Sequence, residues 1–147
     1  MPEIALDHRQ VMDILPHREP MLLVDEVLQL KEMERITARL YINPDWDIFK
    51  GHFPGNPIMP GVLSVECMAQ TADIMLMTAP RYEGLTPLFA GIDTVRFLSP
   101  IYPGDYVVSK VEVLEHIVEK KKVKCSGELY CNGDKLAVTA VLTIAMR

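Results

Sequence analysis

One histidine and one glutamate lie close together in the chain, in surroundings that suit proton transfer. His52 stands in a segment rich in glycine and proline, which predicts a rigid loop (Gly51-His52-Phe53-Pro54-Gly55-Asn56-Pro57-Ile58-Met59-Pro60-Gly61). Glu66 follows in a largely apolar segment. Imidazole is the natural base near neutral pH. A carboxyl group walled by apolar side chains has a raised pKa and suits a general acid. We therefore expect His52 and Glu66 to be catalytic.

A helix must position Glu66. The segment from Gly61 to Thr78 has no proline and no internal glycine, while Pro60 precedes it and Pro80 follows it. Proline is tolerated at the start of a helix and ends one from within, so these residues bound the predicted helix. Most of its side chains are apolar, which is typical of a buried helix.

The polar side chains of this helix share one narrow face. Glu66, Gln70 and Asp73 follow one another at helical spacing. The pattern allows an ordinary face turned to solvent, or a buried carboxyl group that lines a cleft. In the second interpretation Gln70 hydrogen-bonds to Glu66 from one turn further on. The Gly61 N–H, at the helix start, is one of the unpaired donors there and could bind a developing oxyanion.

Length and composition favour one soluble globular domain, which we predict to span residues 1–147. The chain is 49% hydrophobic and 24% charged, ordinary values for that class. Its net charge of −5 argues against a nucleic-acid partner. The helix is interrupted by polar residues, so we expect no membrane span. The polar segment from Met1 to Gln10 lacks a signal-peptide core, and we expect a cytoplasmic location.

Three cysteines form no C-x-x-C motif, and no set of His and Cys has the spacing of metal ligands (Cys67, Cys125 and Cys131). We expect free, mostly buried thiols, no metal and no cofactor.

The remaining segments predict an α+β fold. A short helix is expected from Asp7 to Leu15 and a buried strand from Met21 to Leu30. Alternating patterns or apolar runs predict further strands, and Asn132-Gly133 is the strongest hairpin signal. The phase of the pattern slips near Leu114. The later strands should form a meander of three or four that curls round the helix. The further strands are predicted around residues 36–43, 88–99, 106–118, 123–131 and 136–146.

Four motifs resemble the bacterial FabZ-type (3R)-hydroxyacyl-[acyl carrier protein] dehydratases, in register over most of the chain. The resemblance implies a hot-dog fold, in which one antiparallel sheet wraps a long helix. It also implies a homodimer, further assembled as a trimer of dimers, with each active site shared between two chains. The motifs are Leu15-Pro16-His17-Arg18 with Leu22-Leu23-Val24-Asp25, Gly51-His52-Phe53-Pro54-Gly55 with Pro60-Gly61-Val62-Leu63, Glu66 with Met68-Ala69-Gln70, and Phe89-Ala90-Gly91-Ile92-Asp93 with Pro103-Gly104-Asp105.

The implied reaction is the loss of water from a 3-hydroxyacyl thioester carried by acyl carrier protein. His52 takes a proton from C2, and Glu66 of the other chain either donates a proton to the departing C3 hydroxyl or positions a water molecule for it. His52 Nδ1 is predicted to donate to a main-chain carbonyl near Ile58. Sister FabA-type enzymes carry Asp at the glutamate position, so Glu66 favours the FabZ type. The resemblance also implies that Gly61, Phe53, Val62, Gln70 and Tyr82 bind the substrate, with Tyr82 as a mobile gate over the acyl tunnel.

One departure from the family pattern leaves the carrier open. The family commonly has basic residues after Phe97, where this chain has Leu98 and Ser99, so coenzyme A remains a possible carrier in place of acyl carrier protein. A hot-dog acyl thioesterase, an acyl-CoA hydratase or dehydratase, and a non-catalytic acyl-binding module are the rival functions. The lysines from Lys120 to Lys124 are expected to form a solvated hairpin edge, and His17 is expected to be structural.

Overall fold

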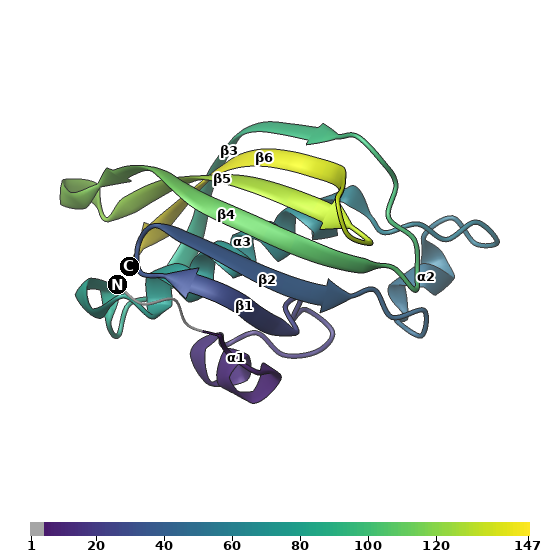
Figure 1. Ribbon diagram of the computed structural model, residues 1–147, viewed down its shortest axis with the longest axis horizontal. Coiled ribbons are helices and arrows are strands. Elements are labelled where there is room, and N and C mark those ends of the chain that lie inside the picture. The colour runs from purple at the N-terminus through teal and green to yellow at the C-terminus, as the bar shows by residue number, and fades with distance from the viewer. Residues whose placement is uncertain (1–4) are drawn as a thin grey trace.

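The computed structural model describes residues 5–147. Residues 1–4, which belong to the N-terminal segment predicted to lack a signal peptide, lie outside the described residues. Helices and strands follow one another in the order shown in Figure 1. They are α1 (His8–Ile14), β1 (Glu26–Lys31), β2 (Arg35–Tyr41), α2 (Ile48–Gly51), α3 (Gly61–Met77), the 3-10 helix η1 (Pro80–Tyr82), β3 (Pro87–Phe97), β4 (Tyr106–Ile117), the 3-10 helix η2 (Val118–Lys120), β5 (Lys122–Cys131) and β6 (Lys135–Met146).

Helix α3 begins and ends where its flanking prolines predict, and the sheet curves over it (Figure 1). The close approach depends on Gly127 in β5. A Cβ atom on Gly127 would lie 2.9 Å from the sulfur of Met68, which is fully buried on α3. Glycine therefore lets the helix pack directly on the strand, and the predicted α+β arrangement of one long helix wrapped by a sheet is confirmed. Within residues 5–147 no helix combines the length and the hydrophobicity that crossing a membrane requires.

The sheet has six strands in the order β1-β2-β4-β5-β6-β3, and every neighbouring pair is antiparallel. The predicted meander is confirmed for β4, β5 and β6. Strand β3 does not extend it, because β3 pairs with β6 at the far edge of the sheet and not with β4. The reason is that α3 crosses the sheet and delivers the chain to that edge. A periodic pattern identifies a strand but not its partner.

Two local irregularities lie where the sequence predicts them. The register of β4 against β5 shifts between Val113 and Glu115, which is the predicted phase slip near Leu114. The turn from β5 to β6 contains Asn132 and Gly133, both with positive φ, as a tight hairpin turn requires. The predicted short helix is present as α1, and the side chain of Asp7 caps it by accepting from the Gln10 N–H.

The strand predicted from Met21 to Leu30 is wrong in its first half. Strand β1 begins only at Glu26. The preceding apolar residues Leu22, Leu23 and Val24 are buried in an irregular segment. A short apolar run indicates burial, but it does not distinguish a strand from an irregular segment. Here the backbone of the segment is hydrogen-bonded to the buried side chain of Gln70.

Candidate active site

His52 follows α2 and is held in one orientation by its loop. Its N–H donates to the Ile48 carbonyl at 3.1 Å, and its ring Nδ1 lies 2.9 Å from the Ile58 carbonyl oxygen. The predicted bond near Ile58 is thereby confirmed. A carbonyl can only accept, so Nδ1 carries the proton and Nε2 has a free lone pair. The loop itself is tied to the segment between β3 and β4 by the Met59 N–H, which donates to the Ile101 carbonyl at 2.7 Å.

A cavity of about 480 Å³ opens beside His52, lined also by Phe53, Gly61 and Phe97. The Gly61 N–H begins α3, and it makes no hydrogen bond to residues 5–147. A Cβ atom on Gly61 would lie 2.8 Å from the Phe97 ring, so only glycine allows the ring to approach the helix start this closely. The cavity thus combines a free imidazole nitrogen with a free backbone donor.

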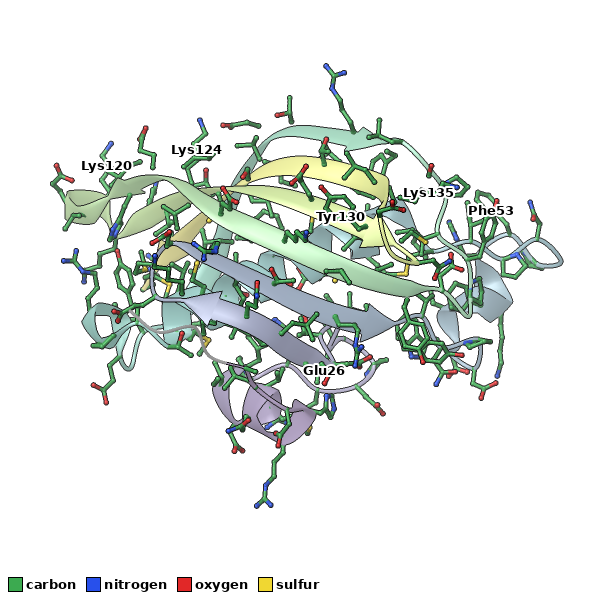
Figure 2. All side chains as sticks on the ribbon, viewed as in Figure 1. Glu26, Phe53, Lys120, Lys124, Tyr130 and Lys135 are labelled. Carbon is green, nitrogen blue, oxygen red and sulfur yellow. The ribbon has the colours of Figure 1, made fainter. Side chains whose placement is uncertain are left out.

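Two of the residues predicted to bind substrate are exposed beside this cavity. Phe53 has a positive φ, a ring centroid 4.4 Å from that of His52, and a side chain that is 57% exposed. Val62, on the first turn of α3, is 76% exposed. In Figure 2 Phe53 lies at one end of the long axis, on the loop beyond the sheet. Large exposed apolar groups of this kind mark a surface that a ligand or a second chain can cover.

Glu66 lies on the second turn of α3 and is oriented by Gln70. The Gln70 Nε2 donates to Glu66 Oε2 at 2.8 Å, which confirms the predicted pair. Gln70 is fully buried. Its Oε1 accepts from the Leu23 N–H at 2.7 Å, and its Nε2 also donates to the Met21 carbonyl at 2.8 Å. One amide side chain therefore fastens the irregular segment before β1 to the carboxyl group of Glu66.

His52 and Glu66 are not brought together within one protomer. Glu66 does not line the cavity that holds His52, and no hydrogen bond or ion pair joins the two side chains among residues 5–147. His52 is oriented by the Ile58 carbonyl, and Glu66 is oriented by Gln70. Within one protomer, the two residues predicted to be catalytic therefore do not line one cavity.

Asp73, two turns beyond Glu66 on the same face of α3, is only 7% exposed. Burial, with a smaller contribution from the charge of Glu66, raises the pKa of Asp73 to about 8. Asp73 makes no hydrogen bond or ion pair with residues 5–147. The narrow polar face is thus largely buried, which favours the interpretation of a covered carboxyl group over that of a helix face turned to solvent.

The cysteines are free and buried, as predicted. Burial raises the pKa of both the Cys67 and the Cys125 thiol to about 12. Since the thiolate is the reactive form, neither residue suits a nucleophile near neutral pH.

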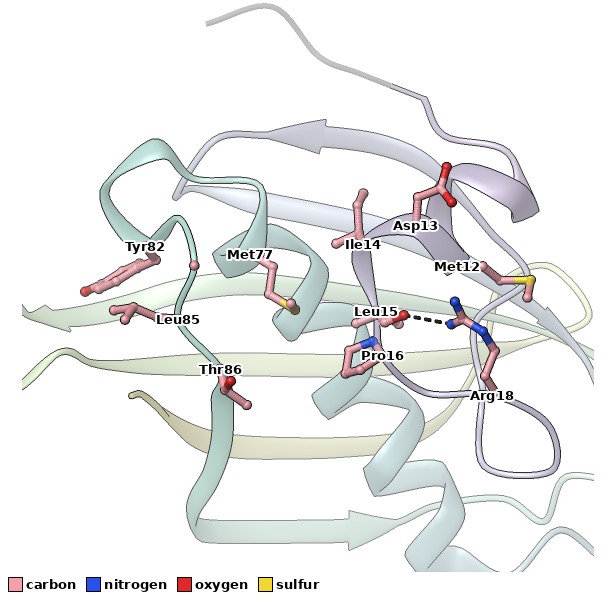
Figure 3. Close-up of a pocket in the computed structure, with 11 residues that line it drawn as sticks. Met12, Asp13, Ile14, Leu15, Pro16, Arg18, Met77, Tyr82, Leu85 and Thr86 are labelled. Atoms are coloured by element: carbon pink, nitrogen blue, oxygen red, sulfur yellow. Dashed lines mark hydrogen bonds between the residues drawn. The ribbon is translucent and has the colours of Figure 1, made fainter.

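Tyr82, predicted to be a gate over the acyl tunnel, does not line the His52 cavity of its own protomer. It belongs to η1, after the C-terminal end of α3, and is only 3% exposed. Its hydroxyl is hydrogen-bonded to Nε2 of His116, which is half-buried. With Met77, Leu15 and Arg18 it lines a separate cavity of about 430 Å³, shown in Figure 3. Within one protomer this cavity shares no lining residue with that of His52.

Sequence reasoning missed one neighbour of Glu66. We expected His17 to be structural, but its Nε2 lies 3.8 Å from Glu66 Oε2. The spacing in sequence gives no sign of this contact, because the loop after α1 and the second turn of α3 meet only in the folded chain. The signal available was the resemblance itself, whose first motif contains His17.

In the described part of the chain, the lysines near the turn between β4 and β5 do not form a second candidate site. Lys120 and Lys121 are exposed, as expected of a solvated hairpin edge, and Figure 2 places Lys120 at the opposite end of the molecule from Phe53. Lys124 forms an ion pair with Asp93 at 2.9 Å. In the part of the chain that the structure describes, no three His, Cys, Asp or Glu side chains are grouped as metal ligands.

Comparison with known proteins agrees with this geometry. Residues 15–140 match the FabA-like domain family. The chain is 39% identical to the 3-hydroxyacyl-[acyl-carrier-protein] dehydratase FabZ of Symbiobacterium thermophilum, over 92% of this chain and 93% of that relative. It is 41% identical to the FabZ protein of Listeria welshimeri, over 88% of this chain and 92% of the relative.

Solved structures share the hot-dog fold at low sequence identity. The dehydratase heterocomplex ApeI:P from Xenorhabdus doucetiae has a TM-score of 0.76 at 20% identity, over 93% of this chain and 90% of that chain. A hypothetical thioesterase from Streptococcus pneumoniae TIGR4, solved with coenzyme A, has a TM-score of 0.64 at 8% identity, over 82% and 84%. At these identities the likeness concerns the fold alone. The match over residues 15–140 and the identities near 40% show that this chain belongs to the FabA-like domain family and, within it, to the FabZ 3-hydroxyacyl-[acyl-carrier-protein] dehydratases.

Proposed function

We propose that this chain dehydrates (3R)-3-hydroxyacyl thioesters of acyl carrier protein to trans-2-enoyl thioesters in fatty acid synthesis. The observation that carries the proposal is the arrangement of the His52 cavity. His52 Nδ1 is engaged by the Ile58 carbonyl, so Nε2 is the available base, and the unpaired Gly61 N–H lies on the same cavity. The names and high identity of the FabZ relatives support the same reaction.

The proposed reaction follows from these donors and acceptors. The thioester carbonyl accepts from the Gly61 N–H, which stabilises the enolate charge that develops on its oxygen. His52 Nε2 takes the proton from C2, and that electron pair becomes the C2–C3 double bond. The C3–O bond breaks, and Glu66 protonates the departing hydroxyl to give water. The proton then returns from His52 to Glu66 through solvent, which restores both residues.

We infer that Glu66 comes from a second copy of the chain, in a homodimer that assembles further into a trimer of dimers. The support is that His52 and Glu66 do not share a cavity in one protomer. In addition, β3 is an edge strand with its outer side unpaired, a feature that natural sheets cover. Four large apolar side chains on β3 are exposed: Leu88, Phe89, Ile92 and Phe97. Pairing of two β3 edges would cover them.

The carrier would have to approach the opening of the active site. Acyl carrier protein is acidic, so docking needs local positive charge on a chain whose net charge is −5. Arg96 is exposed on β3, next to Phe97 of the His52 cavity, and Lys50 and Arg81 are exposed as well. We propose that the reaction takes place in the cytoplasm, where free thiols such as those of this chain stay reduced.

Enoyl absorbance and thiol release separate the candidate reactions. The protein is incubated with 3-hydroxybutanoyl and crotonoyl thioesters, each on acyl carrier protein and on coenzyme A. We expect reversible dehydration and hydration, without thiol release, and a higher kcat/KM on acyl carrier protein. Thiol release without hydration would identify a thioesterase, and tight acyl binding without turnover would identify a binding module. Equal kcat/KM on both carriers would refute the carrier assignment.

Variants test the two residue roles. His52→Ala and Glu66→Gln are each expected to lower kcat by about 10²–10⁴-fold without unfolding. His8→Ala is the matched control, since His8 is an exposed histidine on α1 whose ring is hydrogen-bonded to the Asp25 carbonyl. When the two inactive variants are mixed and their subunits exchange, part of the activity should return. No recovery in exchanged dimers would contradict the shared site.

A further inference from the structure

The carboxyl group of Glu66 has two unequal oxygens. Oε2 receives the Gln70 Nε2 at 2.8 Å and lies 3.8 Å from the His17 Nε2. Oε1 has no hydrogen-bond partner among residues 5–147. It is also not fully buried, since it does not belong to the buried polar atoms without a partner. Oε1 is therefore the oxygen that is open to a substrate, while Oε2 is turned toward protein donors.

The surroundings of His17 determine which ring nitrogen carries its proton. Its Nδ1 is buried and has no hydrogen-bond partner among the described residues. A proton on Nδ1 would bury an N–H group with no acceptor, which is rarer and more costly in folded proteins than an unpaired acceptor. The neutral ring therefore carries its proton at Nε2, and that N–H faces Glu66 Oε2.

The backbone holds His17 at this place. The Arg18 guanidinium donates to the His17 carbonyl at 2.7 Å and to the Leu15 carbonyl at 2.9 Å. Gln70, which binds Glu66, also binds the Leu23 N–H and the Met21 carbonyl further along the same segment. The loop that carries His17 and the carboxyl group of Glu66 are thus fastened to each other.

The distance between His17 Nε2 and Glu66 Oε2 fits a donor that forms a hydrogen bond only when Glu66 becomes a carboxylate. At 3.8 Å the contact is longer than a hydrogen bond, and a shift of less than about 1 Å would make one. Proton donation from Glu66 to the departing hydroxyl leaves a carboxylate, and hydrogen bonds to carboxylates are shorter and stronger than those to neutral acids. The His17 N–H would then bind Oε2 more tightly than before.

We propose that His17 is a positioning residue for Glu66. Together with Gln70 it holds Oε2, so that Oε1 meets the substrate hydroxyl, and its Nε2–H stabilises the carboxylate that proton donation leaves. His17 keeps its own proton throughout, and no bond to it forms or breaks. The inference rests on the proposed dehydration and adds a role for a residue that the reaction does not otherwise use.

Two substitutions of similar length separate this role from a purely structural one. His17→Gln keeps an N–H donor at the position of Nε2, whereas His17→Met fills the same space without a donor. Activity is measured as hydration of crotonoyl-[acyl carrier protein], with thermal unfolding beside it. We expect His17→Met to lower kcat by roughly 10- to 100-fold, below the loss for a fully formed oxyanion donor. KM should change less than about threefold, because the interaction strengthens only as the charge develops.

His17→Gln should retain kcat within about threefold of the wild type, since the donor is kept. Equal losses in the two variants, or no loss in either, would overturn the inference. If wild-type protein shows no hydration at all, the proposed function fails, and the role of His17 fails with it; equal losses in the two variants of an active wild type overturn only the role of His17.

Chemical rescue gives an independent readout if His17→Met does not fold. In His17→Ala, added imidazole should raise kcat because it supplies an N–H group to the vacated space. 1-Methylimidazole is the matched control, since its neutral form has the same ring but no N–H. Equal rescue by both compounds, or rescue by neither, would show that the ring fills space and donates no hydrogen bond.

Discussion

Replacement of Asp73 by asparagine should change how the stability of this protein depends on pH. Asp73 is 7% exposed, and its pKa is raised from 3.8 to about 8 by burial and by the nearby charge of Glu66. In the unfolded chain the same carboxyl group faces water and loses its proton near its ordinary pKa. Between these two values the folded state binds one more proton than the unfolded state.

The sign and size of the effect follow from this difference. Where the folded state binds the extra proton, its free energy of unfolding falls as pH rises, by about 1.4 kcal/mol per pH unit. The contribution of Asp73 is therefore intact below about pH 4 and is lost progressively up to about pH 8. Between about pH 5 and pH 7 the wild type should lose about 2.7 kcal/mol relative to Asp73→Asn, whose amide does not titrate.

Denaturant unfolding at several pH values measures this difference. Wild type and Asp73→Asn are compared at the same protein concentration and ionic strength, because assembly and salt both affect apparent stability. Asp134→Asn is the matched control. Asp134 lies exposed in the turn between β5 and β6, so the same Asp-to-Asn replacement is made at a solvated site and should leave the slope unchanged.

The reasoning is refuted if the curves of wild type and Asp73→Asn run parallel with pH. A constant offset between them would reflect only the different hydrogen bonding of an amide and a carboxyl group. Glu66→Gln offers a second check, because it removes the smaller of the two causes of the raised pKa of Asp73. The pH at which the loss of stability ends should then move downward.

Three further outcomes are expected elsewhere in the fold. Gln70→Leu leaves the Leu23 N–H and the Met21 carbonyl unpaired, so chemical unfolding should show a free energy of unfolding lower by about 2–4 kcal/mol. The control Thr71→Val loses only a hydrogen bond within α3 and should lower it by less than about 1 kcal/mol. Equal losses in the two variants would contradict this reasoning. Gly127→Ala places a methyl group 2.9 Å from the Met68 sulfur and should lower the free energy of unfolding by about 1–3 kcal/mol, whereas no loss would mean that Met68 moves aside freely. Cys67 and Cys125 should react with a thiol reagent only after unfolding, since burial raises both pKa values to about 12; rapid labelling of native protein would show otherwise.

The sequence alone determined the elements of this fold whose cause is local. Prolines bound α3, Asn132-Gly133 forms the hairpin turn, and a break in alternation marks the bulge near Leu114. The orientation of His52 by a carbonyl near Ile58 was also predictable, because both residues belong to one stiff loop. Gln70 lies one helical turn from Glu66, so helical spacing alone brings these two together.

Contacts between distant segments were decided only by the tertiary structure. Strand β3 pairs with β6 because α3 carries the chain across the sheet, which no periodic pattern records. The loop after α1 brings His17 to Glu66, and the 3-10 helix after α3 buries Tyr82 against His116. Local sequence determines backbone conformation through short-range sterics and hydrogen bonds. The contacts between distant segments depend instead on how the chain as a whole buries its apolar surface.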